Sequence, residues 1–316
     1  MKVLCIGEAL IDMICTDRGS SLSNGQNFLK KAGGAPANVA AAIAALGAKV
    51  DMVAKVGKDP FGDHLIQLLK EMGVNTDWII QDPKFFTTFA FVSLMEDGER
   101  DFYFNRGADG QLSSNDLENL TLKDYSIVHF GSATGFLPGP LQNAYAQMFA
   151  DAKANNSIVS FDPNYRHLLF QNNTQNFIDQ CWPFIEQCDF FKVSDEEAIL
   201  ITGCDTVHHA AAALRKKTKA VFAITLGKDG TLISVVDHLE MIGSISITPV
   251  DATGAGDAFV GAVLFQLIHL KPSQLTNLSL DEWKKIIANA NKAGARTCEF
   301  MGAMEAFKHL NKSIFE

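Results

Sequence analysis

The chain has 316 residues, enough for one large α/β domain or about two smaller ones. Apolar residues make up 47% and charged residues 20%, which excludes a disordered or collagen-like chain. Acidic residues outnumber basic ones, 36 to 27, so the net charge is −9 and neither nucleic acid nor an anionic membrane is an expected partner. A small molecule is the expected partner.

Six cysteines are scattered along the chain without a C-x-x-C pair or zinc-type spacing, so we expect reduced thiols and a cytoplasmic protein. The apolar N-terminus has the look of a signal peptide, but Glu8 and Asp12 interrupt it, which favours a buried strand. No run of 18 predominantly apolar residues occurs, so we expect no membrane-spanning segment.

Short apolar, β-branched runs alternate with helical patterns. Six strands are predicted at residues 3–7, 50–57, 126–131, 157–162, 188–194 and 220–227. Two surface helices are predicted at 60–73 and 140–154, each with Pro near its start. This alternation predicts a mostly parallel sheet flanked by helices.

One stretch breaks the alternation. Residues 87–107 are typical of two strands around a turn at 96–99, and the segments 14–19 and 26–31 offer further strands. We therefore expect one domain spanning residues 1–316, with a small discontinuous β lid inserted from about 12–31 and 85–107.

The strongest motif is Asp251-Ala252-Thr253-Gly254-Ala255-Gly256-Asp257, which enters an apolar helical run. The small residues Gly254, Ala255 and Gly256 leave backbone N–H groups open to an anion at the helix N-terminus. Asp257 at the edge of this cradle is suited to accept the proton of an attacking hydroxyl. The alternative is a tight turn in which the Asp serves only as a cap.

Two other phosphate-binding motifs are excluded. A dinucleotide fingerprint needs Gly where Phe259 stands, and a Walker A loop needs Ser or Thr after Gly-Lys, whereas the chain has Gly227-Lys228-Asp229.

A second motif, Gly33-Gly34-Ala35-Pro36-Ala37-Asn38, precedes an Ala-rich helix. Its glycines and the Asn38 amide suit a polyhydroxylated ligand, and the alternative is a simple helix start. Asp12 follows the first strand, where open α/β sheets bind ligands, and is suited to bond two sugar hydroxyls; the alternative is an ordinary loop acid.

These two motifs, in this order, resemble the signatures of the ribokinase-like (PfkB) carbohydrate kinase family. The resemblance extends from Val3 to about Ala303 and includes the turn Thr225-Leu226-Gly227-Lys228-Asp229-Gly230, which is similar to the nucleotide-binding turn of that family. It implies a ribokinase-like fold and ATP-dependent phosphorylation of a sugar hydroxyl.

The resemblance also implies roles for individual residues. Asp257 matches the catalytic base, and the amides of Gly254, Ala255 and Gly256 match an anion hole. Glu197 matches the acid that orders the water shell of Mg²⁺, although Ser194 stands where many members have Asn. The residues expected at the nucleotide are Lys192, Ser194, Thr225, Gly227, Gly230 and Asn289, and those expected at a monovalent cation such as K⁺ are Asp251 and Thr253.

Further details resemble fructokinases, notably Phe161-Asp162-Pro163-Asn164-Tyr165-Arg166. The expected sugar-binding residues are Asp12, Gly33, Gly34, Asn38, Arg106 and Arg166; for either arginine the alternative is a surface salt bridge. The resemblance implies phosphorylation of fructose at its 6-hydroxyl. The alternatives are a kinase for 2-keto-3-deoxygluconate, for another furanose or for a nucleoside, and a catalytically silent relative that senses sugar. The protein could also form a homodimer.

Overall fold

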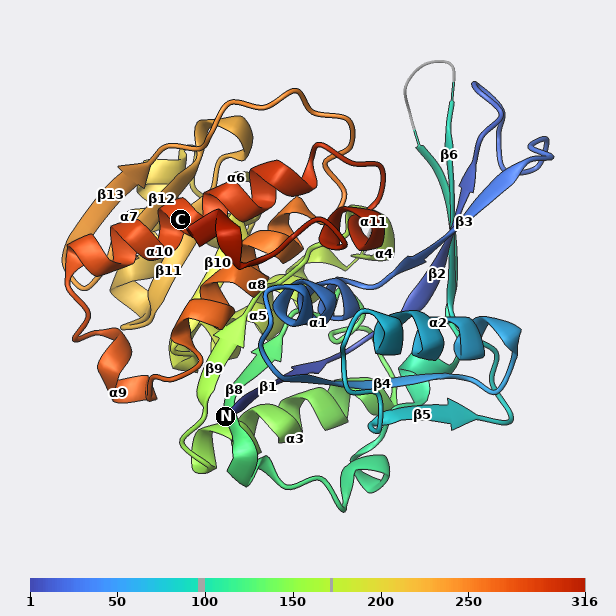
Figure 1. The fold of residues 1–316 in the computed structure, drawn as a ribbon, viewed down its shortest axis with the longest axis horizontal. Helices are drawn as coiled ribbons and strands as arrows, with labels where there is room; N and C mark the ends of the chain where they lie inside the picture. Colours follow the sequence, from blue (N-terminus) through green and yellow to red (C-terminus); the bar gives the residue numbers. More distant parts are fainter. Residues whose placement is uncertain (96–99, 171–172, 316) are drawn as a thin grey trace.

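The computed structural model describes residues 1–95, 100–170 and 173–315, so the turn predicted at 96–99 lies outside the described residues. The larger of its two sheets has nine described strands in the order β13-β12-β11-β10-β9-β8-β1-β4-β5 (Figure 1). Their bounds are β1 (Lys2–Ile6), β4 (Val50–Gly57), β5 (Ile79–Asp82), β8 (Tyr125–Phe130), β9 (Ile158–Phe161), β10 (Phe190–Ser194), β11 (Val221–Thr225), β12 (Thr231–Val235) and β13 (His238–Ile242). Neighbours pair in parallel except at β12, which is antiparallel to both β11 and β13. The mostly parallel sheet predicted from the sequence is confirmed.

Helices cover both faces of this sheet, which is why its central strands are predominantly apolar. One face packs against α1 (Ala35–Ala45), α2 (Pro60–Glu71), α8 (Ala255–Leu267) and α10 (Leu280–Thr297). The other packs against α3 (Pro140–Ala154), α5 (Thr174–Gln187), α6 (Asp195–Thr202) and α7 (Val207–Lys217). Short helices complete the chain: α4 (His167–Phe170), α9 (Pro272–Leu275) and α11 (Ala303–Phe307), with 3₁₀ turns at Ala108–Gln111, Ser114–Leu117, Leu122–Asp124, Gly227–Asp229 and Lys312–Phe315.

The smaller sheet has the strand order β3-β2-β6-β7, with β2 (Leu10–Cys15), β3 (Phe28–Gly33), β6 (Phe89–Leu94) and β7 (Arg100–Asn105). It lies to one side of the larger sheet, beyond α1 and α2 (Figure 1). Its two halves come from separate segments of the chain, so the small discontinuous sheet is confirmed, as is its β6–β7 hairpin.

One predicted strand lies elsewhere. The strand expected at 14–19 runs over Leu10–Cys15 instead. The reason is Asp17, whose carboxylate accepts hydrogen bonds from the backbone N–H of Gln26 (2.7 Å) and Asn27 (3.0 Å). These bonds close a loop between Asp17 and residues 26–27, so the chain turns after β2 and the strand ends there.

Within the described residues, no helix combines the length and apolar character needed to cross a membrane.

Candidate active site

The cradle predicted at residues 254–256 lies at the N-terminus of α8. Gly254 has φ of 83°, a left-handed conformation, and a Cβ there would collide with Ala303. The helix begins at Ala255 without a side-chain cap, so the cradle is formed by backbone. A helix N-terminus with small residues is suited to bind an anion through N–H groups and the helix dipole.

Asp257 lies in the first turn of α8 and is 8% exposed. Its Oδ2 accepts a hydrogen bond of 2.8 Å from Nδ2 of Asn38, in the first turn of α1. Burial raises the pKa of Asp257, and the Asn38 hydrogen bond and the charges of Arg166 and Lys192 oppose the rise. A buried carboxylate of raised pKa is a better proton acceptor than a solvated one.

The Asn38 amide has a second polar atom, its oxygen Oδ1. Its Oδ1 is buried and has no hydrogen-bond partner among the described residues. A buried amide oxygen without a partner is unfavourable, so this atom is suited to accept a hydrogen bond from a hydroxyl group of a ligand beside Asp257.

Asp12 pairs with Lys31 in the β2–β3 ladder of the small sheet, and a Cβ on Gly33, two residues further along β3, would collide with the Asp12 carboxylate. Burial raises the pKa of Asp12 to about 6, while the charge of Arg166 opposes the rise. The Arg166 side chain is exposed and donates to Oδ1 of Asn164 (3.3 Å). The charge of Arg166 therefore lowers the pKa of both Asp12 and Asp257 relative to the effect of burial alone. Gly34, at φ 106°, packs against the Glu8 carbonyl, where a Cβ would collide.

Arg106, by contrast, is engaged with the protein. Its guanidinium donates to the carbonyls of Thr134 (3.2 Å) and Pro138 (2.6 Å) and pairs with Asp109 (3.5 Å). These bonds connect the end of β7 to the loop after β8, and the pair with Asp109 is the salt bridge that was the alternative to a sugar-binding role for Arg106.

Lys192, in β10, is buried beneath the cradle. Its Nζ lies 3.2 Å from Oδ2 of Asp162 and 3.3 Å from the position that a Cβ on Gly256 would take. Sequence reasoning did not assign a role to Asp162, because its partner lies on the neighbouring strand.

Ser194 and Glu197 cap α6 reciprocally. The Ser194 hydroxyl accepts from the Glu197 N–H (3.1 Å), and Oε2 of Glu197 accepts from the Ser194 N–H (2.8 Å). Oε1 of Glu197 accepts from the N–H of Tyr165 (2.8 Å). Serine and asparagine are both favoured N-caps, so Ser194 caps α6 although many family members have Asn at this position.

Asp251 and Thr253 form a compact oxygen cluster before the cradle. Oδ1 of Asp251 accepts from the Thr253 N–H (3.0 Å) and hydroxyl (2.7 Å), and Oδ2 accepts from the N–H of Gly302 (2.8 Å). These bonds hold the pKa of Asp251 below its usual range, so the carboxylate is ionised.

The remaining predicted nucleotide residues are divided between two places. Thr225 pairs with Ser194 in the β10–β11 register, and the turn after it uses positive φ at Gly227 (56°) and Gly230 (111°). Asn289 lies in the α8–α10 interface, where its Nδ2 donates to Oε1 of Gln266 (2.9 Å).

Glu8 is a site residue that the sequence analysis treated only as an interruption of the N-terminus. It is 1% exposed, and its carboxylate accepts from the hydroxyl of Ser132 (2.5 Å) and from the N–H of Ala35 (3.2 Å), where α1 begins. It therefore fixes the start of the helix that carries Asn38. An acid directly after a buried strand was the available signal.

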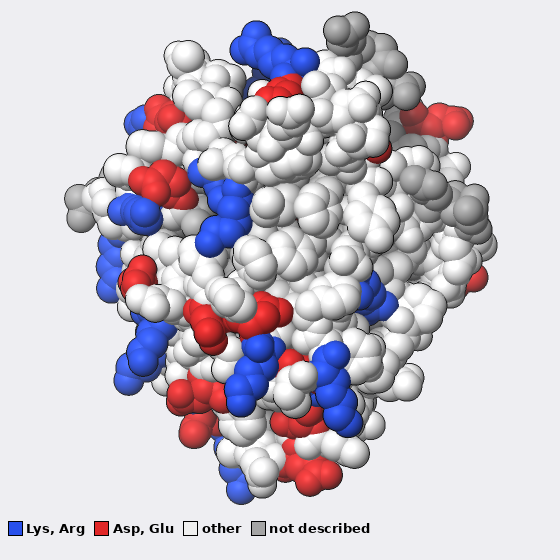
Figure 2. Space-filling model, turned by 90° about the vertical axis from the view of Figure 1, so that its right-hand side faces the viewer, with Lys and Arg blue, Asp and Glu red and all other residues white. Residues whose placement is uncertain are grey.

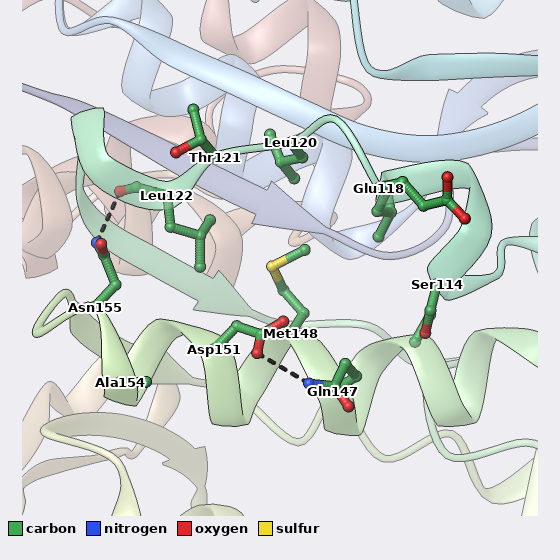
Figure 3. Close-up of a pocket in the computed structure, with 12 residues that line it drawn as sticks. Ser114, Glu118, Leu120, Thr121, Leu122, Gln147, Met148, Asp151, Ala154 and Asn155 are labelled. Atoms are coloured by element: carbon green, nitrogen blue, oxygen red, sulfur yellow. Dashed lines mark hydrogen bonds between the residues drawn. The ribbon is translucent and has the colours of Figure 1, made fainter.

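A surface hollow of about 530 Å³ lies elsewhere, between α3 and residues 114–122 (Figure 3). Met148 and Leu122 point into it, and Glu118 and Asp151 lie at its rim. It contains none of the predicted site residues.

Comparison with known proteins agrees with this geometry. The model of the pfkB family carbohydrate kinases matches residues 1–309. Fructokinase-1 of Zea mays is 36% identical over 310 residues, covering 96% of this chain and 93% of the relative. The structure of a fructokinase from Xylella fastidiosa with bound ATP matches with a TM-score of 0.86 and 28% identity, covering 99% and 96% of the two chains. A double mutant of the Vibrio cholerae fructokinase, with fructose, ADP and potassium ion, matches with a TM-score of 0.82 and 27% identity over 99% and 96%. The chain belongs to the pfkB family of carbohydrate kinases and is an ATP-dependent carbohydrate kinase.

Proposed function

We propose that the protein is a fructokinase that transfers the γ-phosphoryl group of ATP to the 6-hydroxyl of fructose, with Asp257 as general base. The observation that carries this proposal is the Asn38–Asp257 pair. One amide atom orients the carboxylate, and the other, Oδ1 of Asn38, is a buried acceptor without a partner among the described residues. This pair is suited to hold a hydroxylated carbon chain against a base.

In this reaction the sugar oxygen attacks the γ-phosphorus, its proton passes to Asp257, and the bond between phosphorus and the bridging oxygen breaks to release ADP. Charge that develops on the phosphoryl oxygens faces the backbone of 254–256 at the N-terminus of α8. Preorganised N–H groups stabilise such charge without reorganising during the reaction.

A neutral sugar fits the charges of the site better than an acidic one. The charge of the exposed Arg166 acts on two carboxylates, half-buried Asp12 and buried Asp257, and Arg106 is already engaged by protein acceptors. A sugar carboxylate would therefore be repelled unless Arg166 alone compensated for both acids. Relatives that are named fructokinases also support fructose as the substrate of this protein.

Mg²⁺ fits this site when it is bound to the phosphates of ATP. The described residues contain no group of three or more His, Cys, Asp or Glu side chains placed to hold a metal. Mg²⁺ usually keeps several waters and binds to phosphates with one or two carboxylates, so Glu197 would reach it through water, and Mg²⁺ would supply charge neutralisation. Asp251 and Thr253 present the hard oxygen donors that a monovalent cation requires, and we propose them as K⁺ ligands.

We also propose that the protein forms a homodimer through the small sheet. Ile14 and Leu29 pair across β2 and β3, lie on the face that carries Asp12, and are 40% and 44% exposed. On the side of the molecule shown in Figure 2, a broad central area of the described surface carries few charges. Ile14→Asp should shift the sedimentation coefficient to that of a monomer, whereas Leu239→Asp on β13, 41% exposed, should leave it unchanged.

The activity is tested by coupled ADP release with equal concentrations of fructose, 2-keto-3-deoxygluconate, ribose and a nucleoside. We expect kcat/KM for fructose to exceed that for 2-keto-3-deoxygluconate at least about tenfold, equivalent to about 1.4 kcal/mol. A preference for the acidic sugar that Arg166→Ala removes would identify Arg166 as a carboxylate clamp and overturn fructose. No ADP release with any sugar would instead indicate a silent relative.

A further inference from the structure

Lys192 stands out by its burial. Among the side chains that the structure describes, it is the single buried Lys or Arg, at 7% exposed. Removing an ammonium group from water is unfavourable by several kcal/mol in proteins unless a partner compensates. The Lys192 ammonium group under the cradle at 254–256 therefore requires a compensating partner.

The position of the ammonium is fixed by Asp162, directly after β9. Nζ of Lys192 lies 3.2 and 3.4 Å from the two carboxylate oxygens, and the Asp162 side chain is fully buried. Oδ1 of Asp162 also accepts from the N–H of Asn164 (3.3 Å). The carboxylate is thus held from two sides, and the ammonium that it holds lies beside Gly256, 3.3 Å from its Cβ position.

His129 is a second buried side chain with a basic nitrogen, and it is uncharged. His129, in β8, is fully buried and shares a hydrogen bond of 3.1 Å with Ser160, while its Nε2 has no partner among the described residues. Burial and the charge of Lys192 lower the pKa of His129 to about 3. Positive charge beneath the cradle therefore comes from Lys192 and not from the imidazole.

The resemblance implies that Lys192 lies at the nucleotide; we propose more specifically that Lys192 is a catalytic cation that contacts the transferring phosphoryl group at the anion hole, and that Asp162 is the positioning residue that holds Lys192 charged and directed at Gly256. This inference rests on the proposed kinase reaction at the same site. Lys192 forms and breaks no covalent bond and keeps its protons; its N–H groups offset the charge that accumulates on the phosphoryl oxygens while the bond to the sugar oxygen forms and the bond to ADP breaks.

Removing the Lys192 charge should act on the transition state. Lys192→Met should lower kcat at least about 100-fold and change the sugar KM less than about threefold, because the lost contact forms at the phosphoryl group and not at the sugar. An unchanged kcat would overturn the role of Lys192.

The role of Asp162 is tested by pH dependence. The charges that face Lys192 are Asp162, Glu197 on α6 and Asp257 on α8, with neutral His129 on β8, and the three carboxylates raise the pKa of Lys192 against the effect of burial. In Asp162→Asn the largest of these attractions is lost, so the ammonium should deprotonate at lower pH. We expect kcat to fall at least tenfold more than in the wild type between pH 7 and pH 9.5.

Lys192→Arg in the Asp162→Asn background should remove this alkaline loss, because a guanidinium stays protonated throughout. Parallel profiles for wild type and Asp162→Asn, or an alkaline loss that persists with Arg at position 192, would overturn the positioning role.

A control lies on β4, toward the other end of the sheet. Asp51 is 3% exposed and accepts from Nζ of Lys2 (2.9 Å), whose side chain is 29% exposed, so Asp51→Asn breaks a Lys–Asp pair that does not involve the cradle. It should lower thermal stability and leave the pH profile unchanged. The wild type is first assayed with the sugar panel, and the variants are then measured with whichever sugar it accepts. Failure of the fructose assignment is thereby distinguished from failure of the Lys192 assignment.

Discussion

The Asn38 amide and the Asp257 carboxylate, 219 residues apart in sequence, are joined by a hydrogen bond of 2.8 Å. The helices that carry them, α1 and α8, pack so closely that a Cβ on Gly261 would lie 2.8 Å from the Cβ of Ala42. The loop that leads into α1 and the cradle that leads into α8 are therefore held in one rigid unit. In the proposed reaction, this pair would couple the position of the sugar to that of the phosphoryl group.

Asp257→Asn should lower kcat by about 10²- to 10⁴-fold, because it removes the proton acceptor while preserving shape. Binding of MgATP and fructose, measured by titration calorimetry, should stay within a few-fold of the wild type. Turnover near the wild-type rate would show that Asp257 is not the base.

Asn38→Asp should move the pH profile of kcat. A second carboxylate beside Asp257 raises its pKa further, and since the base must be deprotonated to act, activity should be lost at higher pH on acidification. We expect kcat at pH 7 to fall at least about tenfold and to recover partly at pH 9. Asn38→Ala adds no charge and is the control; an unshifted acid limb in Asn38→Asp would contradict the coupling.

The parts of the candidate site that could be predicted from the sequence lie in short motifs of consecutive residues. The cradle at 254–256, Asn38 and Asp257 each lie in a local motif whose backbone requirements are visible in the residue types. The Lys192–Asp162 pair was not predicted, because it depends on β9 and β10 being neighbours. The site role of Glu8 depends in the same way on the packing of β1 against α1.

The fold shows the same division. Six strands of the larger sheet were predicted from their apolar runs, whereas β5, β12 and β13 had no predicted counterpart. β13 carries polar His238 and Glu240 at the sheet edge, and it is mostly exposed, so its pattern lacks the buried run that identifies central strands.

Two glycines of the cradle should respond differently to alanine. Gly254→Ala forces a side chain onto a positive φ and against Ala303, so we expect a loss of stability of at least about 1–3 kcal/mol by urea unfolding. Gly256→Ala places a methyl group 3.3 Å from Nζ of Lys192, so it should fold well and lose kcat more than it raises KM. An effect of Gly256→Ala confined to KM would mean that the cradle only binds nucleotide.

The Asp12 carboxylate should lower the free energy of unfolding of the ligand-free protein, while it contributes to sugar binding. Its folded-state pKa of about 6 exceeds its ordinary value, so the charged form is disfavoured by folding, and this cost grows as pH rises toward 6 and is complete above it. Asp12→Asn should therefore stabilise the ligand-free protein by on the order of 2 kcal/mol at pH 8 and by little at pH 4. The same variant should raise the KM for fructose at least tenfold; a stability gain independent of pH would contradict the assignment.

The small sheet should close over bound sugar. Asp12 lies on this sheet and Asp257 on α8, so a sugar that contacts both draws the two together and excludes water from the phosphoryl group. Hydrogen exchange at saturating fructose should show added protection in β6 and β7, with the central strand β9 as an unchanged reference. Removing the whole hairpin, residues 87–107, should raise sugar-independent ATP hydrolysis relative to kinase activity, because water would then reach the γ-phosphoryl group beside an intact base. If fructose leaves the exchange of β6 and β7 unaltered, the small sheet is a fixed wall, and the exclusion of water must come from the sugar itself.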